Sequence, residues 1–337
     1  MPPANAAPAA DHRLLADVGG TNARFALQSG AQGAITHIQT LPCADHASLG
    51  EAIEHYLRQQ APAQRPQLAA IAIANPIQGD RVQMTNHHWS FSISALQAAL
   101  GLKQLELLND FTALALALPH LPDSDLRQVG GRTGASAAHS TTALGLIGPG
   151  TGLGVSGLVP DGRGGWWPLQ GEGGHVSLSA TNAQEQTALA LLWARFGHVS
   201  AERAVSGQGL SNLYGALTQR DGGAWPDRLP SAAEVTEWAM GGQDARAQEA
   251  LDLFFAFLGT VAGNLALTLG AWDGIFLGGG ILPRLGQRID ASAFRERFER
   301  KGRFENHLKP VPVWVIEAGQ SPALLGASKK LDMLAAP

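Results

Sequence analysis

The sequence predicts an α/β fold in which helices pack against central sheets. Segments with the apolar pattern of β-strands alternate along the chain with segments that have the apolar period of helices. Two segments, near residues 19 and 150, share one further pattern, in which a glycine-rich turn joins two apolar strands. The chain has 337 residues, which is enough for two domains. We therefore interpret the two segments as matching parts of two similar halves.

Composition narrows the function classes. Hydrophobic residues make up 45% and charged residues 15% of the chain, as in a globular protein. The 24 Lys and Arg residues against 28 Asp and Glu residues give a net charge of -4, which argues against a nucleic-acid partner. The sequence contains no run of eighteen apolar residues and therefore predicts no membrane span. The single cysteine, Cys43, predicts a reducing, cytoplasmic compartment. The Pro/Ala-rich residues 1–13 lack the features of a signal peptide, so we expect a disordered tail there.

The first strand–turn–strand segment is "LLADVGGTNARFAL", residues 14–27. Its turn, Gly19-Gly20-Thr21, predicts a hairpin in which the two glycines supply the positive φ angles of a tight turn. The same turn favours a phosphate site, because unobstructed backbone N–H groups can form a concave anion site. The Thr21 hydroxyl and the Asp17 carboxylate lie close by in the sequence. The segment alone leaves both interpretations open.

Further strands and helices follow in alternation. "LAAIAIANP" predicts a buried strand over residues 68–76, and "QLELLND" predicts a strand over 104–110 before a helix that ends near Pro119. Capping-box spacings at Ser48-x-x-Glu51 and Ser231-x-x-Glu234 mark two helix starts. A long helix is expected over 244–269 and strands over 274–281 and 311–317. The Gly/Ser/Ala-rich segment 130–140 predicts a linker between the halves.

The second glycine-rich turn lies in "TTALGLIGPGTGLGVSGLVP", residues 141–160. Residues 152–157 match the spacing of a dinucleotide-binding fingerprint, but a strand and a loop follow where that fingerprint needs a helix. No Gly-Lys dipeptide occurs, which excludes a Walker P-loop. Two glycine turns facing each other would instead hold a polyphosphate, with Asp17 binding Mg²⁺ through water. A third cluster, Gly278-Gly279-Gly280, would let a flat base lie close to the backbone.

Polar residues at three places complete a candidate site. Asn109 and Asp110 end a strand, where α/β folds bind ligands, although either residue can also cap the following helix. Glu172 and His175 lie on the glycine-flanked loop "GEGGHVS", which lacks the helical His pair of a zinc protease and suits a polyhydroxylated ligand. Glu202, in "HVSAERAVSG", joins them or is a helix-start acid near Ser200.

Seven motifs occur in order: "ADVGGTNARFAL", "MTNHHWSFS", "LLNDFTALALALP", "GPGTGLGVSGLV", "LQGEGGHVSL", "GHVSAERAVSG" and "GIFLGGGILPR". Together they resemble the bacterial ATP-dependent glucokinases of the hexokinase–actin–heat-shock ATPase superfamily, over residues 14–331. The resemblance implies a two-domain actin-like ATPase (ribonuclease H-like) fold with a cleft between a small and a large domain. The small domain would hold residues 14–120 plus 320–337, and the large domain residues 121–319.

The same resemblance implies a reaction and its residues. The γ-phosphoryl of ATP would pass to the 6-hydroxyl of glucose, giving glucose 6-phosphate and ADP, with Mg²⁺ present and a homodimer as the assembly. Asp110 would be the catalytic base, and the glucose-binding residues would be Asn109, Asp110, Glu172, His175 and Glu202. The ATP-binding residues would be Ala16, Asp17, Val18, Gly19, Gly20, Thr21, Gly148, Gly150, Thr151, Gly152, Gly278, Gly279 and Gly280.

Three other functions are alternatives to this one. A kinase for another hexose, such as mannose, glucosamine or fructose, is the main alternative on the same scaffold. A sugar-responsive transcription regulator would need a DNA-binding module, for which only about sixteen residues precede the first turn. An actin-like or chaperone ATPase would share the glycine turns but not the polar cluster. The cysteine-rich zinc motif of the related sugar kinase and repressor family does not fit a chain with one cysteine.

Overall fold

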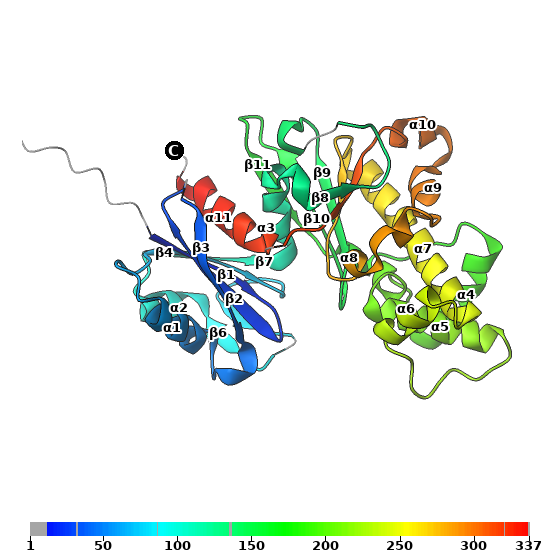
Figure 1. Ribbon diagram of the computed structural model, residues 1–337, viewed down its shortest axis with the longest axis horizontal. Coiled ribbons are helices and arrows are strands. Elements are labelled where there is room, and N and C mark those ends of the chain that lie inside the picture. Colours follow the sequence, from blue (N-terminus) through cyan, green and yellow to red (C-terminus); the bar gives the residue numbers. More distant parts are fainter. Residues whose placement is uncertain (1–11, 32, 86, 135–136, 320, 336–337) are drawn as a thin grey trace, which may run out of the picture. The chain divides into compact units, whose positions relative to one another are not determined.

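The computed structural model describes residues 12–31, 33–85, 87–134, 137–319 and 321–335 (Figure 1). Within them the chain divides into two compact units. Unit 1 contains residues up to His120 and from Gly319 onward, and unit 2 contains Leu121–Ala318. Each unit has a central sheet and its own hydrophobic core.

The sheet of unit 1 has five strands in the order β3-β2-β1-β4-β7. Strands β1 and β2 form a hairpin, β2 pairs antiparallel with β3, and β1, β4 and β7 run parallel. Because the parallel strands share one direction, their carboxyl ends meet at the same edge of the sheet. The strands of unit 1, with the short hairpin β5–β6, are β1 (His12–Val18), β2 (Asn22–Ser29), β3 (Ile35–Pro42), β4 (Leu68–Ile73), β5 (Arg81–Gln83), β6 (Ser90–Ser92) and β7 (Gln104–Asn109).

Helices cover both faces of this sheet (Figure 1). On one face lie α1 (Leu49–Gln60) and α2 (Ile93–Leu100), and on the other α3 (Asp110–Ala117) and the C-terminal helix α11 (Pro322–Ala335). Helix α11 packs directly on α3, where Gly326 lies so close to Ala113 that any side chain would overlap the Ala113 carbonyl. The buried Arg13 guanidinium donates to Asp332 at 2.6 Å, which joins the first strand to the last helix.

The sheet of unit 2 repeats the same pattern and adds one strand. Its order is β11-β10-β9-β12-β13-β8, and β9, β12 and β13 run parallel while β10, β11 and β8 pair antiparallel. The first five strands match the order and directions of the unit 1 sheet, which confirms two similar halves. The strands are β8 (Leu126–Gln128), β9 (Leu144–Pro149), β10 (Leu153–Pro160), β11 (Trp166–Gln170), β12 (Ile275–Leu277) and β13 (Val313–Ile316).

The helices of unit 2 gather around α7, which is the long helix predicted from sequence. Among the described residues it is the one helix long and apolar enough to cross a membrane, and most of it is buried in the core of unit 2. The helices are α4 (Ala183–Phe196), α5 (Gly207–Arg220), α6 (Ala232–Met240), α7 (Ala245–Leu269), α8 (Leu282–Leu285), α9 (Phe294–Glu299) and α10 (Glu305–Leu308), with 3-10 turns η5 (Gly173–His175) and η6 (Ala201–Arg203) used below.

Helix starts largely follow the predicted caps. At α6 the full capping box forms between Ser231 and Glu234. At α1 the Ser48 side chain accepts from the Glu51 N–H, but the Glu51 carboxylate accepts from the Ala47 N–H instead of closing the box. The α1 start is therefore capped on one side only.

Two expectations about connections are wrong. The segment 130–140 was expected to link the halves but lies inside unit 2, where Arg132 pairs with Asp273 at 2.8 Å. The first glycine turn was expected to have positive φ at Gly19 and Gly20, and neither residue has it. The reason is a three-residue connection closed by the Gly19 N–H donating to the Asn22 carbonyl at 2.9 Å, which needs no mirror-image turn.

The predicted tail falls mostly outside the described residues. Residues 1–11 lie outside them, and His12 and Arg13 belong to β1 rather than to a tail. The predicted boundary at Gln320 also lies outside the described residues.

Candidate active site

The carboxyl edge of the unit 1 sheet brings two acids together. Asp17 is the last residue but one of β1, and Asn109 ends β7, with Asp110 directly after it. Register pairs Asp17 with Ala72 and Asn109 with Ile73, so the ends of β1 and β7 lie on either side of the end of β4. The predicted catalytic residue and the predicted metal-binding residue therefore share one edge.

The two alternatives for Asn109 and Asp110 separate in the structure. Asn109 is the N-cap of α3, and its Oδ1 accepts from the Phe111 N–H at 2.9 Å and the Thr112 N–H at 3.2 Å. Asp110 is the first helical residue, and its Oδ1 also accepts from the Phe111 N–H at 2.9 Å. Because Asn109 satisfies the helix start, the fold does not need Asp110 as a cap.

Burial raises the pKa of Asp110 to about 6. The hydrogen bond from the Phe111 N–H opposes this shift, and the negative charge of Asp17 adds to it. A carboxylate with a raised pKa at the end of a sheet strand is typical of a group that takes up a proton during a reaction.

A hydroxyl from the C-terminal segment reaches Asp17. Ser321, one residue before α11, donates from its Oγ to Asp17 Oδ2 at 2.5 Å. Sequence analysis did not identify Ser321, although Ser-Pro is a common helix start and Pro322 opens α11. The contact orients one oxygen of Asp17 and leaves the other for a ligand.

The first glycine turn exposes its backbone. A Cβ atom added at Gly19 would meet only the Asn22 carbonyl, at 3.6 Å. The Thr21 carbonyl accepts from the Cys43 N–H at 2.8 Å, which fixes the turn against the next segment. Ala16 and Val18 are fully buried in the sheet, backbone included, so no atom of these two predicted ATP-binding residues is exposed to a nucleotide.

The second glycine turn joins β9 to β10 in unit 2. Gly148 pairs with Gly154 across the hairpin, and the Gly150 N–H donates to the Gly152 carbonyl at 2.8 Å. The Gly150 carbonyl in turn accepts from the Gly207 N–H at 2.8 Å, at the start of α5. Thr151 is exposed at the tip of the turn. The hydrogen bond from Gly207 thus fixes the base of the turn, and Thr151 at its tip remains exposed to solvent.

The third glycine cluster packs against the second turn. The Gly278 N–H donates to the Ile147 carbonyl at 2.9 Å. Gly279 has a φ of 81°, and a side chain there would overlap the Pro149 carbonyl, whereas Gly280 has open space around it. The predicted phosphate and adenosine segments of unit 2 therefore lie side by side.

Glu202 contacts this turn directly. Its Oε2 accepts from the Leu153 N–H, the first residue of β10, at 2.8 Å. Glu202 lies in the first turn of η6 after Ser200, so it is also the helix-start acid of the alternative interpretation, but its side chain bonds to this distant strand. One oxygen of the carboxylate holds the glycine turn, which leaves the other for a ligand.

Glu172 and His175 lie beside Glu202 in unit 2. Both side chains are exposed, at 65% and 60%, and they approach each other to 4.0 Å. Their turn, η5, packs against β10, and the Ala201 N–H donates to the Val176 carbonyl at 2.9 Å. All three predicted sugar-binding residues of unit 2 are thus brought together next to the second glycine turn.

Metal binding rests on few residues. Among the described residues, no group of three or more His, Cys, Asp or Glu side chains is placed to hold an ion. Asp17, with one oxygen free of Ser321, fits Mg²⁺, which usually takes one or two protein carboxylates and fills its remaining positions with water and phosphate.

Comparisons with known proteins cover nearly the whole chain. The Glucokinase family profile matches residues 14–333. A glucokinase from Aromatoleum aromaticum is 52% identical over 320 residues, covering 95% of this chain and 94% of that protein. A glucokinase from Chromobacterium violaceum is 52% identical over 330 residues, covering 98% and 92%. The crystal structure of a glucokinase from an Antarctic psychrotroph has a TM-score of 0.86 at 36% identity, covering 96% of this chain and 99% of that one.

These matches extend over nearly the whole chain. The α/β architecture with two mixed sheets is the actin-like ATPase fold of two-domain sugar kinases. With a family profile that spans residues 14–333 and relatives more than 50% identical, the chain belongs to the glucokinase family.

Proposed function

We propose that Asp110 is the catalytic base of this enzyme and that the 6-hydroxyl of glucose is its acceptor. The chain is an ATP-dependent hexose kinase that phosphorylates glucose. A primary hydroxyl is a poor nucleophile, so a kinase contributes mainly by positioning it, stabilising charge and accepting its proton. Two observations support this role for Asp110. Asn109 caps α3, so Asp110 is not needed as a cap, and burial raises the pKa of the Asp110 carboxylate. The raised pKa of Asp110 is the observation that carries the assignment.

In this proposal the polar side chains predicted from the sequence bind glucose. Glu172, His175 and the free oxygen of Glu202 bind sugar hydroxyls. Because the Oδ1 of Asn109 is occupied by the start of α3, Asn109 contributes its amide N–H groups as donors. A set of carboxylates and donors discriminates strongly against an analogue that lacks a hydroxyl, since it leaves a polar group unpaired.

In the same proposal the predicted glycine turns bind ATP. The backbone N–H groups of Gly20 and Thr21 in the first turn, and those of Thr151 and Gly152 in the second, face the phosphates, and residues 278–280 lie next to the adenosine. The N–H groups of Gly19 and Gly150 are already donated within their own turns. Asp17 would hold Mg²⁺ through water, and the ion would supply positive charge to the phosphates. Thr21 and Thr151 supply hydroxyl donors at the tips of the two turns.

We further propose a cytoplasmic homodimer without nucleic-acid or membrane partners. The support is the family and the mildly acidic net charge of -4. Another hexose, such as mannose, glucosamine or fructose, remains the competing substrate.

One assay tests the function and the alternative together. Sugar-dependent ADP release is measured with Mg²⁺-ATP over a panel of hexoses, and the products are identified by phosphorus NMR. We expect glucose to have the highest kcat/KM and to give glucose 6-phosphate alone. A higher kcat/KM for another hexose would identify that sugar as the substrate, and glucose 1-phosphate would exclude the assigned geometry.

A further inference from the structure

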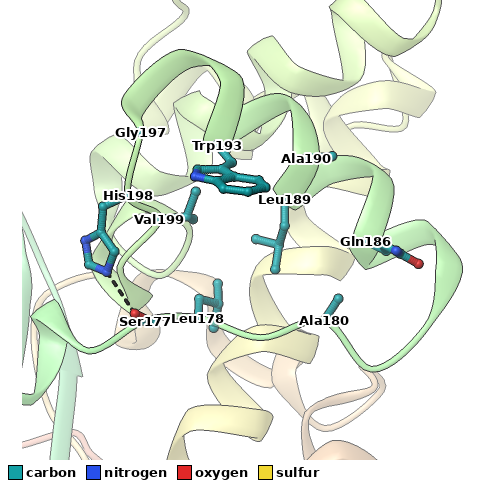
Figure 2. A pocket seen from close by; sticks show the side chains of 10 residues that line it. All are labelled: Ser177, Leu178, Ala180, Gln186, Leu189, Ala190, Trp193, Gly197, His198 and Val199. Carbon is teal, nitrogen blue, oxygen red and sulfur yellow. Dashed lines mark hydrogen bonds between the residues drawn. The ribbon is translucent and has the colours of Figure 1, made fainter.

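A cavity lies in unit 2 next to the polar loops of the proposed site, with Ser177 on the first loop and His198 and Val199 on the second. It has a volume of about 430 Å³, within the range of small-molecule sites. Helix α4 forms one wall, and the segments 177–180 and 197–199 form the other (Figure 2). No residue of the cavity belongs to the proposed ATP or glucose site.

The cavity is apolar along its walls. Leu178, Leu189 and Val199 line it, and the indole of Trp193 stands over its opening (Figure 2). Trp193 is 66% exposed, which is unusual for a side chain of this size. A flat ring entering between Trp193 and Leu178 would cover this exposed indole face.

The two ends of the cavity are polar. Ser177 Oγ and His198 Nε2 lie 2.9 Å apart at one end, and Gln186 lies at the other (Figure 2). If the imidazole N–H donates to Ser177 Oγ, the serine keeps its own hydrogen for a ligand. This end therefore suits an acceptor oxygen at the edge of an apolar ring.

The wall formed by α4 is held in place by a buried ion pair. Glu185, in the first turn of α4, pairs with Arg297 at 2.8 Å, and both side chains are almost fully buried. The Thr181 N–H donates to the same carboxylate at 2.8 Å. A wall fixed in this way gives a preformed site and lowers the ordering cost of binding.

We propose that this cavity is an effector site for a small ligand with a flat apolar ring and an acceptor oxygen at its edge. Trp193 stacks on the ring, and Ser177 donates to the oxygen. The ligand would not resemble glucose or ATP phosphates, because the cavity walls are apolar.

The position of the cavity connects it to glucose binding. Ser177 and Leu178 follow His175 by two and three residues, and Val199 precedes Glu202 by three. A bridge between Ser177 and Ser200 and a hydrogen bond from the Leu178 N–H to the Val199 carbonyl join the two segments. A ligand that spreads or tightens them changes the spacing of His175 and Glu202. This coupling rests on the proposed roles of those two residues in glucose binding.

The test uses 8-anilinonaphthalene-1-sulfonate as a probe, because it has fused rings and an acceptor anion. Its fluorescence is titrated with the full chain, with and without saturating glucose. We expect saturable 1:1 binding and a change of about fivefold in its Kd when glucose is present, at the lower end of typical coupling. We also expect Trp193→Ala to raise the Kd at least tenfold.

A matched variant separates this site from general surface binding. Trp167→Ala removes another exposed tryptophan, 60% accessible, from β11 and should leave the Kd unchanged. Each of three results would overturn the proposal: equal changes of the probe Kd in the two variants, no saturable binding of the probe, or a probe Kd that is the same with and without glucose. A lower mass of Trp193→Ala by light scattering would also overturn it and assign the surface to a second copy of the chain. Probe binding does not depend on phosphoryl transfer, so failure here is distinct from failure of the kinase assignment.

Discussion

Replacing Asp110 with asparagine tests the assigned base through activity and stability at once. The side-chain oxygen that accepts from the Phe111 N–H is kept, and Asn109 still caps α3. A general base contributes about 10²–10⁴-fold to the rate, or roughly 3–5 kcal/mol of barrier. We expect Asp110→Asn to lose at least 100-fold in kcat with little change in glucose affinity. A kcat above a tenth of the wild-type value would refute the assignment.

Although Asp110→Asn is expected to lose activity, we expect it to increase the free energy of unfolding. The folded protein raises the pKa of Asp110 from its ordinary 3.8 to about 6, so the folded state binds this proton more tightly than the unfolded state. The ionised carboxylate therefore costs stability increasingly as pH rises from about 4 to 6, and the full cost remains above pH 6. Two units of pKa correspond to about 3 kcal/mol.

The expected result is a pH-dependent gain in the variant. Asp110→Asn should be more stable than wild type by up to about 3 kcal/mol at pH 8 and by about half of that at pH 5. Urea unfolding at both pH values measures the difference, with Asp45→Asn, an exposed aspartate of the same unit, as the control. A variant less stable than wild type at pH 8 would show that the carboxylate is structural. In the wild type, kcat/KM for glucose should fall below about pH 6 as Asp110 is protonated.

Three further predictions concern the residues around the site. Gly279→Ala should raise the KM for ATP and lower stability by about 1–3 kcal/mol, because its positive φ and a neighbouring carbonyl leave no room for Cβ; Gly280→Ala, in open space, is the control, and equal effects would refute the packing argument. Glu202→Ala should raise the KM values of both glucose and ATP because its carboxylate also holds the second glycine turn, whereas Glu172→Gln should raise only that of glucose; unchanged ATP kinetics in Glu202→Ala would show that the contact is dispensable. Ser321→Ala should weaken Mg²⁺-ATP binding, measured by calorimetry without sugar, by about 1–3 kcal/mol, and unchanged binding would remove Ser321 from the site.

Local patterns were sufficient for much of the fold. Strand–turn–strand segments, the helix of residues 245–269 and the position of Asn109 and Asp110 at a strand end all follow from residues close together in sequence. The composition of residues 130–140 favoured a connection, but composition does not indicate which connection crosses between units. The predicted positive φ angles of the first turn were wrong. The sign of φ depends on the length of the turn, and that length depends on where pairing of the two strands stops.

Contacts between distant residues could not be predicted in this way. Ser321 lies 304 residues from Asp17, and Glu202 lies 49 residues from Leu153. Neither side chain has a local partner that marks its role, and only the assembled sheets place them. Of the predicted sugar-binding residues, Glu202 was therefore expected beside a ligand but not as a support of the glycine turn.

The closing of unit 1 by α11 has a consequence for how the chain is made. The strand that begins at His12 is joined to α11 through Arg13 and Asp332, and Gly326 packs on α3. During synthesis Gly326 and Asp332 emerge from the ribosome only after all of unit 2. Unit 2 can therefore fold before unit 1, whose earlier residues lack their partners on α11 until then. Asp17 and Asp110 therefore acquire their native surroundings last. An incomplete chain, or one that ends before Ser321, is therefore expected to turn over no ATP.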